Sequence, residues 1–471
     1  MHPGNFLKNL KLDFPYELTG SQEKLLIKIT DFLFNYPKDI FILKGYAGTG
    51  KTSIISTLVK NLPKIKKKAV LLAPTGRASK VMTSYSGIPA YTLHKHLYYP
   101  ETDEFGKPHF TLRKNKLKNT VFIVDEASMI SGQNTSEDFF NASSLLSDLI
   151  DFVYSNSGNQ LILVGDKAQL PPVGTSLSPA LDEQYLSSNF DKNIQSFELT
   201  EIVRQTLDSG ILFNATKIRD EILSEIPGKL KFDTTGFKDI IRLIDGYDIQ
   251  DAIETAYYGN NFEETAIIVR SNKRANLYNQ QIRSKVLLKE NELDTGDYLM
   301  IVKNNYFWLD KSSPAGFIAN GDIIEILEIF KFIDLYGFRF AEVKIRMLDY
   351  PTQKPFETVI LLDTLNSETP SLTYQENNKL YQAVKEDFSH LSKWQQYKAV
   401  KNNKYFNALQ VKYAYALTGH KSQGGQWNNV FIEQPYNLNT TDKEQLRWLY
   451  TAFTRAKKKL YLIGFKDELF Q

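Results

Sequence analysis

Four nearly continuous apolar runs mark the first part of the chain, at residues 40–43, 69–73, 120–124 and 160–165. Runs of this kind are typical of strands that are buried on both faces of a parallel sheet. Before the first run, residues 23–34 place apolar side chains at helical spacing, which predicts an amphipathic helix. Because strand and helix patterns alternate, we expect an α/β domain over residues 1–195.

The alternation begins again after residue 196 and is interrupted once. Residues 294–409 contain short strand-like segments with turn signals between them, which predicts a small β-barrel, and within this stretch residues 374–406 are polar, rich in Lys and aromatic residues and expected to be helical. The α/β pattern returns with the apolar run at 411–418. We therefore expect a second α/β domain made of residues 196–293 and 410–471, with the barrel inserted into it.

The pattern also changes between residues 98 and 119. The turn residues Asp103–Pro108 separate two short segments that can pair as a β-hairpin. This stretch is too short to be a domain, so we expect a protrusion from the first α/β domain.

A glycine-rich segment follows the first apolar run and leads into a helical pattern. It fits the phosphate-loop pattern G-x-x-x-x-G-K-[ST], in the strand, loop and helix context that the motif requires. Backbone N–H groups and the helix N-terminus would cradle phosphates, Lys51 would reach the β- and γ-phosphates, and Thr52 would ligate Mg²⁺. A chance glycine-rich turn is the alternative, which this context disfavours. The predicted nucleotide-binding residues of the loop are Gly45, Ala47, Gly48, Thr49, Gly50, Lys51 and Thr52.

Polar side chains follow the third and fourth apolar runs. Asp125 and Glu126 end the third run, where an aspartate can hold Mg²⁺ opposite Thr52 and a glutamate can polarise an attacking water. A plain surface turn is the alternative for this acidic pair. Gln169 follows the fourth run and is expected on the same rim, where its carboxamide can sense a γ-phosphate.

Two residues far from the glycine-rich loop in sequence have side chains suited to a nucleotide. Gln22 lies in the first turn of the predicted N-terminal helix, and a carboxamide can pair with both N6 and N7 of adenine. Arg455 lies on a predicted helix near the end of the sequence, where an arginine finger would be useful. The alternatives are a solvated glutamine and an arginine in an ordinary ion pair.

The second apolar run ends in a polar and basic segment, Pro74–Lys80. Ligands of open α/β sheets bind beyond the carboxyl ends of the strands, so this segment is placed for a second ligand. Thr92 and His94 follow, next to further basic side chains. A metal site at His94 and His96 is disfavoured because no carboxylate lies at ligand spacing.

Composition narrows the class of protein only slightly. The chain of 471 residues is long enough for several domains, and its formal net charge of +3 means that a polyanionic partner would need clustered basic residues. The sequence contains no Cys, which excludes disulfides, thiol nucleophiles and Cys-based zinc sites. It contains no apolar run long enough to span a bilayer and no N-terminal secretory signal, so we expect a cytoplasmic protein without a membrane partner.

Taken in order, these motifs resemble those of superfamily-1 helicases, and within them the RecD/Dda branch, which moves 5′ to 3′ on DNA. The resemblance extends from Leu18 to Ile463. It implies two RecA-like parallel-sheet P-loop domains, with a small hairpin insertion in the first and an SH3-like β-barrel insertion in the second. It also implies roles for the residues of the ATP site. These are Gln22 for adenine, Lys51 and Thr52 for phosphate and Mg²⁺, Asp125 and Glu126 for metal and water, Gln169 for the γ-phosphate, and Arg204 and Arg455 across the cleft.

The same resemblance assigns contacts to DNA. The implied single-strand contacts are Pro74, Thr75, Gly76, Arg77, Lys80, Thr92 and His94 in the first domain, and Thr418, His420, Lys421 and Ser422 in the second. Gly425 and Gln426 would adjoin the nucleotide, with Gln426 at a position where many members carry a glutamate for the ribose. Phe105 would lie in a strand-separating pin, by its position alone.

The resemblance implies an ATP-dependent DNA helicase or translocase that uses ATP and Mg²⁺ and acts on single-stranded DNA and duplex junctions. Replication and repair proteins are its expected partners, and DNA replication, repair and recombination are its expected processes. The alternatives are a DNA-stimulated ATPase that displaces proteins, a motor subunit of a larger nuclease complex, and an RNA helicase.

Overall fold

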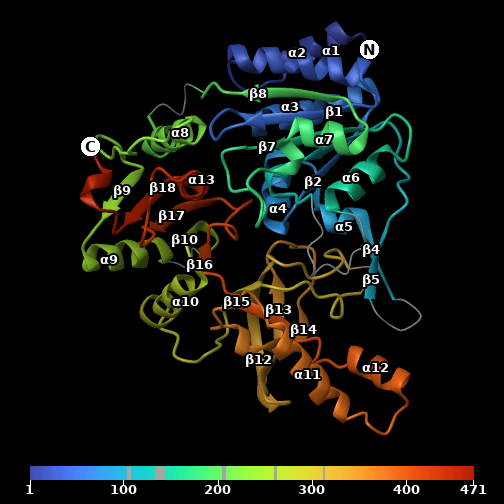
Figure 1. The fold of residues 1–471 in the computed structure, drawn as a ribbon, viewed down its shortest axis with the longest axis vertical. Coiled ribbons are helices and arrows are strands. Elements are labelled where there is room, and N and C mark those ends of the chain that lie inside the picture. Colours follow the sequence, from blue (N-terminus) through green and yellow to red (C-terminus); the bar gives the residue numbers. More distant parts are fainter. Residues whose placement is uncertain (103–107, 133–143, 204–207, 259–261, 311–312) are drawn as a thin grey trace.

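A six-stranded parallel sheet forms the core of the first unit, in the order β3-β2-β6-β7-β1-β8 (Figure 1). The computed structural model describes the chain except residues 103–107, 133–143, 204–207, 259–261 and 311–312. Ile40 and Ile42 enter one hydrophobic core while Phe41 and Leu43 enter another, so β1 is buried on both faces, as its apolar run predicts. The strands are β1 (Ile40–Gly45), β2 (Lys68–Ala73), β3 (Ala90–Thr92), β6 (Thr120–Val124), β7 (Gln160–Gly165) and β8 (Ile194–Leu199).

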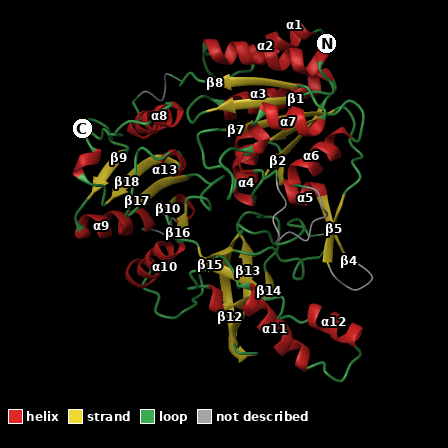
Figure 2. Ribbon diagram, viewed as in Figure 1, coloured by secondary structure: helices red, strands yellow, loops and turns green. Residues whose placement is uncertain are grey.

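Helices cover both faces of this sheet (Figure 2). Four helices pack on the face that holds Phe41 and three on the face that holds Ile40. The first four are α1 (Pro3–Leu12), α2 (Gly20–Asn35), α3 (Lys51–Asn61) and α4 (Gly76–Ser86), and the other three are α5 (Leu93–Leu97), α6 (Leu145–Tyr154) and α7 (Glu183–Phe190).

A five-stranded parallel sheet, in the order β16-β10-β17-β18-β9, forms the core of the second unit. Its central strands pair Ile267 with Phe431 and Phe431 with Tyr461, and all three side chains are buried. The strands are β9 (Ile240–Leu243), β10 (Thr265–Val269), β16 (Ala416–Thr418), β17 (Trp427–Glu433) and β18 (Ala456–Ile463), and the helices are α8 (Gly210–Leu223), α9 (Gly246–Tyr257), α10 (Asn272–Gln281) and α13 (Lys443–Phe453).

A closed five-stranded barrel is inserted into this second unit between α10 and β16. With the two parallel sheets, it confirms the predicted fold class. The strands are β11 (Tyr298–Ile301), β12 (Ile323–Leu335), β13 (Phe338–Met347), β14 (Phe356–Leu361) and β15 (Leu409–Tyr413). Two helices, α11 (Tyr374–Glu386) and α12 (Lys393–Lys401), lie between β14 and β15 and form the helical stretch that the sequence predicts.

The predicted return of the α/β pattern at residue 411 differs from the structure. The apolar run at 411–418 is divided: its first part belongs to β15 of the barrel, and only β16 joins the second sheet. All five residues of β15 are buried, so its hydrophobic pattern resembles that of a parallel-sheet strand. The pattern could not assign the run to one sheet or the other.

The predicted hairpin is present. Strand β4 (Tyr98–Thr102) pairs with β5 (Pro108–Leu112) in antiparallel register and projects from the first unit (Figure 1). Phe105, the residue expected in the pin, lies outside the described residues. No helix within the described parts of the chain is long and apolar enough to cross a membrane.

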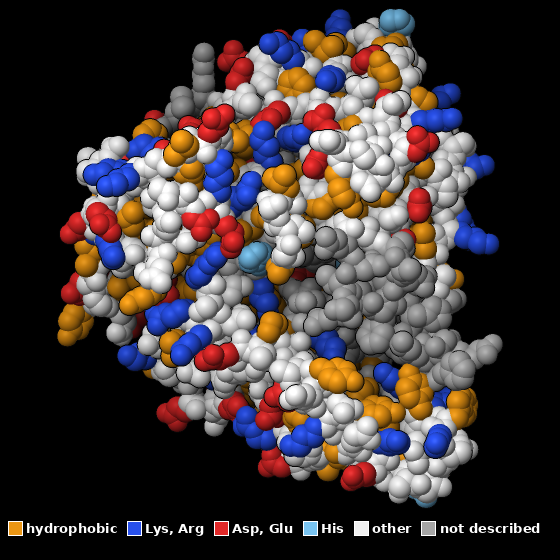
Figure 3. Space-filling model, viewed as in Figure 1, with side chains coloured by type: hydrophobic (Ala, Val, Ile, Leu, Met, Phe, Trp, Pro, Cys, Tyr) orange, Lys and Arg blue, Asp and Glu red, His pale blue; other side chains and the backbone are white. Residues whose placement is uncertain are grey.

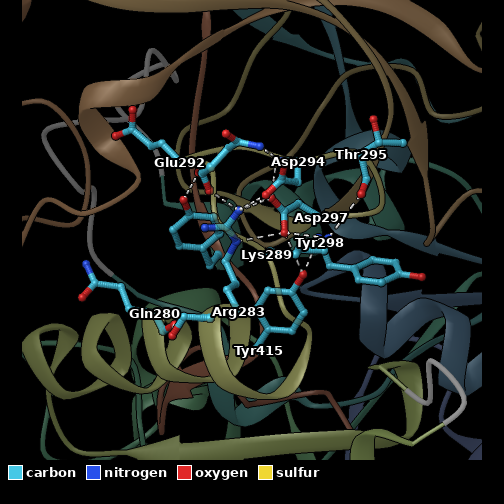
Figure 4. Close-up of polar contacts among 12 residues, drawn as sticks. Gln280, Arg283, Lys289, Glu292, Asp294, Thr295, Asp297, Tyr298 and Tyr415 are labelled. Atoms are coloured by element: carbon cyan, nitrogen blue, oxygen red, sulfur yellow. Dashed lines mark hydrogen bonds and ion pairs between the residues drawn. The ribbon is translucent and has the colours of Figure 1, made fainter.

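A buried ion-pair cluster joins the barrel to the second sheet (Figure 4). Arg283, in the π-helical turn η6 (Ile282–Val286) after α10, donates to both carboxylate oxygens of Asp297 at 3.0 and 2.8 Å. Lys289 and the Tyr415 hydroxyl donate to the same carboxylate at 2.9 and 3.0 Å. Because Asp297 is fully buried and immediately precedes β11, the cluster fixes the entry of the chain into the barrel.

Candidate nucleotide and nucleic-acid sites

A cleft of about 470 Å³ lies at the carboxyl ends of β1, β6 and β7 and is lined by both α/β units. The first unit contributes the glycine-rich loop and the polar residues that follow the strands. The second contributes residues from the loop before β17 and from the end of α13. The predicted site residues that line the cleft are Ala47, Gly48, Gly50, Lys51, Thr52, Asp125, Glu126, Gln169, Gln426 and Arg455.

The glycine-rich loop forms a compact turn before α3. Gly48 and Gly50 have φ values of 75° and 84°, which disfavour any residue with a side chain. Helix α3 begins at Lys51, whose Nζ donates to the carbonyl oxygens of Gly45 and Tyr46 at 2.6 and 2.9 Å. The loop therefore places a lysine ammonium and a helix N-terminus at one end of the cleft, an arrangement that suits phosphate.

The acidic pair lies at the end of β6, opposite the glycine-rich loop. Asp125 accepts a hydrogen bond from the Tyr85 hydroxyl at 2.7 Å, and burial together with the charge of Glu126 raises the pKa of Asp125 above its ordinary value. Thr52 and Asp125 both line the cleft. A hydroxyl and a carboxylate are hard oxygen donors, which suit Mg²⁺ beside phosphate oxygens.

Gln22 does not line the described cleft. Its carboxamide is 1% exposed, and both of its ends are hydrogen-bonded: Oε1 accepts from the Thr19 N–H at 3.1 Å, and Nε2 donates to the Thr49 carbonyl at 3.0 Å. The alternative of a solvated glutamine is therefore wrong. In this structure Gln22 supports the glycine-rich loop from behind, and its role towards adenine stays a prediction.

Arg455 reaches the cleft from the second unit. Its side chain is almost completely buried, donates to the Thr451 and Gly425 carbonyls at 3.0 and 3.2 Å, and lies 3.6 Å from the Glu126 carboxylate. The ion pair with Glu126 thus spans the two units. Arg204, the other arginine that the sequence analysis singled out, lies outside the described residues.

Gln169 lines the cleft and is 7% exposed. Its Oε1 atom is buried and accepts no hydrogen bond from any residue that the structure describes. An orphaned carboxamide oxygen in a polar cleft is costly unless a ligand or water satisfies it. This observation suits a polar ligand beside Gln169.

Tyr450 is a cleft residue that the sequence analysis missed. It lies on α13 of the second unit, is fully buried, and its hydroxyl donates to Asp166 of the first unit at 2.7 Å. The same hydroxyl accepts a hydrogen bond from the Ala47 N–H in the glycine-rich loop at 2.9 Å. No sequence signal distinguishes Tyr450 from an ordinary core tyrosine, because only the docking of the two units gives it these partners.

The predicted first-domain DNA contacts lie directly after β2 and at the end of β3. Thr75 and Thr92 cap α4 and α5, accepting from the N–H groups of Ala78 and Lys95 at 3.2 and 3.3 Å. The Arg77 guanidinium lies 4.6 Å from the ring centroid of Trp427 in the second unit. Arg77 therefore contributes to the junction between the two units.

The barrel covers part of this segment, which the sequence did not predict. A Cβ atom on Gly76 would lie 2.7 Å from the Asp322 carboxylate, and Lys80 donates to the Leu348 carbonyl at 3.3 Å. Burial raises the pKa of both Asp322 and Asp349 above the ordinary range of a carboxyl group. The barrel thus presents acidic side chains to the basic end of β2.

The predicted second-domain contacts follow β16. Ser422 is fully buried and donates to the Gly419 carbonyl at 2.8 Å, so its hydroxyl shapes the loop in this arrangement. Lys421 is partly buried, and burial together with the nearby charge of Lys412 lowers its pKa to about 8. Burial also lowers the pKa of His420, which favours its neutral form.

Comparisons with known proteins agree with this architecture. The AAA domain model matches residues 18–226, and the model of the UvrD-like helicase C-terminal domain matches residues 413–463. The chain is 26% identical to the RecBCD enzyme subunit RecD of Buchnera aphidicola over 98% of this chain and 75% of that protein. It is 23% identical to the ATP-dependent DNA helicase dda of Enterobacteria phage T4, over 89% of this chain and 93% of that protein.

Some relatives are longer than this chain, and a solved structure aligns with nearly all of it. The chain spans 38% of the length of the protein MJ1519 of Methanocaldococcus jannaschii, with 27% identity over 94% of this chain. The crystal structure of Pif1 helicase from Bacteroides in complex with ADP-AlF3 and ssDNA covers 97% of this chain and 95% of its own, with 16% identity and a TM-score of 0.48.

Proposed function

We propose that this chain, which belongs to the superfamily-1B DNA helicases of the RecD, Dda and Pif1 type, uses ATP to move 5′ to 3′ along single-stranded DNA and to separate duplex DNA. The observation that carries the proposal is the divided cleft. One wall holds the glycine-rich loop and the acidic pair, and the other holds Arg455. A nucleotide bound between them would touch both α/β units at once.

The ion pair between Arg455 and Glu126 across this cleft explains how ATP would drive movement of the two units. Arg455 lies 3.6 Å from Glu126 in the structure, and the γ-phosphate of ATP offers it a stronger, charge-assisted partner. Binding of ATP would therefore favour the closed arrangement of the units, and loss of phosphate would remove that preference. Repeated closing and opening would move a strand held by both units.

The residues at the cleft suit Mg²⁺ together with ATP. Thr52 and Asp125 would hold the ion, which supplies charge neutralisation at the β- and γ-phosphates when bound. Glu126 would orient the attacking water and Gln169 would contact the γ-phosphate. Gln22, Gly425 and Gln426 would lie on the side of the adenosine.

Single-stranded DNA would lie across the carboxyl ends of both sheets. The first unit would contact it through Thr75, Arg77 and Lys80, and the second through His420 and Lys421. Contacts of this kind bind phosphate oxygens and tolerate any sequence. Asp322 of the barrel lies over Gly76, and Glu263 of the second unit pairs with Lys80 at 3.2 Å, so the strand would compete with these contacts for part of this surface.

A strand-displacement assay with 5′-tailed and 3′-tailed DNA and RNA duplexes tests the proposal. Lys51→Ala is expected to abolish ATP hydrolysis and unwinding while single-strand binding stays within about threefold, because Lys51 faces the nucleotide and not the strand. Lys60→Ala, an exposed lysine on the same helix, is the matched control and should unwind normally. Unwinding by Lys51→Ala at the normal rate, or of 3′-tailed substrates alone, would overturn the proposal.

The hairpin is the proposed pin. Deletion of residues 104–107 is expected to leave DNA-stimulated ATPase activity intact and to lower the number of base pairs opened per ATP. If the number of base pairs opened per ATP is unchanged, the hairpin is not the strand-separating pin. Displacement of bound proteins without unwinding would instead favour a translocase, and a role in replication, repair or recombination fits any of these outcomes.

A further inference from the structure

Helix α4 connects the predicted DNA surface with the nucleotide cleft. Gly76, Arg77 and Lys80, three of the predicted DNA contacts, lie in its N-terminal half. In Figure 1 the helix lies between the first sheet and the barrel, on the side that faces the second unit. Its 11 residues span about 16 Å, so one rigid element serves both sites. The residues of α4 that line the cleft follow at helical spacing and are Ala78, Val81, Ser84 and Tyr85.

Tyr85, in the last turn of α4, is hydrogen-bonded to the acidic pair of the cleft. Its hydroxyl donates to Oδ2 of Asp125 at 2.7 Å, and Oδ1 of the same carboxylate accepts from the Glu126 N–H at 2.8 Å. Each carboxylate oxygen keeps a second lone pair, so these two bonds orient the group and leave it able to bind a further ligand. The orientation of Asp125 therefore depends on a side chain of α4.

The backbone of Glu126 depends on the same carboxylate. Glu126 has a φ of 52°, in the left-handed region that residues with a side chain seldom adopt, and the bond from its N–H to Asp125 stabilises this turn. The Glu126 carboxylate lies 3.6 Å from Arg455 of the second unit. A continuous series of contacts thus runs from α4 through the acidic pair to the opposite wall of the cleft.

The N-terminal half of α4 also contacts the second unit. A Cβ atom on Gly424 would lie 2.8 Å from the Ala78 Cβ atom and 2.9 Å from the Thr75 hydroxyl oxygen. Gly424 follows the predicted second-domain DNA contacts in the same loop. Figure 3 shows Lys and Arg side chains gathered where the two α/β units meet, which favours anionic ligands at this junction. A strand bound to both units would therefore contact this end of the helix.

Packing alone does not account for the hydroxyl group of Tyr85. The ring packs beside the first hydrophobic core, which contains the fully buried Met82 one turn earlier. A phenylalanine ring would fill the same space, whereas the hydroxyl group meets a carboxylate that is expected to hold Mg²⁺. Hydrogen-bond partners of metal-binding carboxylates commonly change metal affinity or activity about 10- to 100-fold.

We propose that Tyr85 is a positioning residue for Asp125 and that α4, through this hydroxyl group, couples the binding of single-stranded DNA to the binding and hydrolysis of ATP. The inference rests on the proposed function, which supplies both ligands. DNA would contact one end of α4 and the nucleotide site the other, so each ligand would favour a particular placement of the helix. Linkage then requires each ligand to change the affinity of the other by the same factor.

The affinity of a labelled single-stranded oligonucleotide tests the inference without ATP hydrolysis. Fluorescence anisotropy without nucleotide, and with a saturating non-hydrolysable ATP analogue and Mg²⁺, gives the coupling factor. We expect a change of roughly 5- to 150-fold in the unmodified protein and of less than about threefold in Tyr85→Phe. Binding of the oligonucleotide alone, and of the analogue alone, should be the same in both proteins. The stimulation of kcat for ATP hydrolysis by DNA should fall roughly 10- to 100-fold in Tyr85→Phe.

Tyr405→Phe is the matched control. Tyr405 is also partly buried, and its hydroxyl donates to the Glu342 carboxylate at 3.0 Å, but it does not line the cleft. This variant should keep the coupling factor and the stimulation by DNA.

Three results would overturn the inference: full coupling in Tyr85→Phe, a coupling factor of one in the unmodified protein, or weaker binding of either ligand alone that accounts for the whole effect. Coupling that depends on Tyr85 in a protein that does not unwind DNA would overturn the proposed strand separation and leave this inference standing.

Discussion

The Tyr450 hydroxyl donates to the buried Asp166 carboxylate at 2.7 Å and so connects the second α/β unit to the first. The same oxygen accepts from the Ala47 N–H of the glycine-rich loop at 2.9 Å. Burial raises the pKa of Asp166, and Tyr450 is one of the hydrogen-bond donors that favour its charged form. One hydroxyl thus links the strand end, the loop and the opposite unit beside the proposed nucleotide site.

Replacing Tyr450 with Phe should loosen the junction between the units. The substitution leaves the Asp166 carboxylate and the Ala47 N–H each without one buried partner, at a cost of about 1–3 kcal/mol. We expect a lower midpoint of thermal unfolding and weaker binding of a fluorescent ATP analogue. Tyr436→Phe, at a highly exposed tyrosine, is the control. If both variants behave alike, the bridge has no energetic role.

The substitution Arg455→Lys tests whether the cleft needs only the positive charge of Arg455 or also its planar guanidinium. Lysine keeps the positive charge but loses the planar fork that contacts Glu126 and the Gly425 carbonyl. We expect the rate constant of ATP hydrolysis to fall roughly 10³-fold, in line with loss of an arginine finger, while nucleotide affinity changes little. Steady-state ATPase assays with Arg242→Lys as the control measure this. A decrease confined to KM would show that Arg455 acts in binding rather than in the chemical step.

The proposed contact of Lys421 with DNA predicts that DNA binding depends on pH. Its pKa is lowered to about 8 by burial and by Lys412, so its ammonium is present at pH 7 and is lost as the pH rises through 8. A bound phosphate favours the charged form, so affinity for a labelled oligonucleotide should fall above pH 8 by up to about tenfold per pH unit. Fluorescence anisotropy at constant ionic strength measures the profile. Lys421→Arg stays charged and should flatten it, and a profile unchanged by this substitution would contradict the assignment.

The lowered pKa of Lys421 also makes the stability of the fold depend on pH. Between about pH 8 and the ordinary lysine pKa of about 10.4, the unfolded chain binds more protons at this residue than the folded chain. The contribution of Lys421 to the free energy of unfolding therefore increases as the pH rises across that window. Below pH 8 the penalty for a partly buried ammonium is complete. Weaker DNA binding at high pH would thus not arise from unfolding at Lys421.

Asp297→Ala should be strongly destabilising. The substitution leaves Arg283 without its main partner in a buried site, and such losses cost about 3–5 kcal/mol. We expect a lower denaturant midpoint for the second unit and its barrel, followed by circular dichroism. Asp251→Ala, at an exposed position on α9, is the control. A midpoint that matches this control would exclude a structural role for the cluster.

The residues of the first wall of the cleft could be predicted because their positions follow from local rules. The glycine-rich loop, Asp125, Glu126 and Gln169 all come directly after buried strands, and parallel strands bring their carboxyl ends to one edge. Tyr450 and Asp322 could not be found in this way. Their partners lie in other units, and hydrophobic periodicity carries no information about how units dock. Likewise, the apolar run at 411–418 gives no sign that it serves two sheets.

The two ends of the barrel insertion meet. Strands β11 and β15 pair in antiparallel register, with Leu299 opposite Tyr413, and such pairs lie about 5 Å apart. A short turn could therefore rejoin the second unit if the barrel were removed or exchanged. The barrel is therefore topologically separable from the sheet that carries it, so this inserted domain can be lost or replaced during evolution without rearranging the second unit.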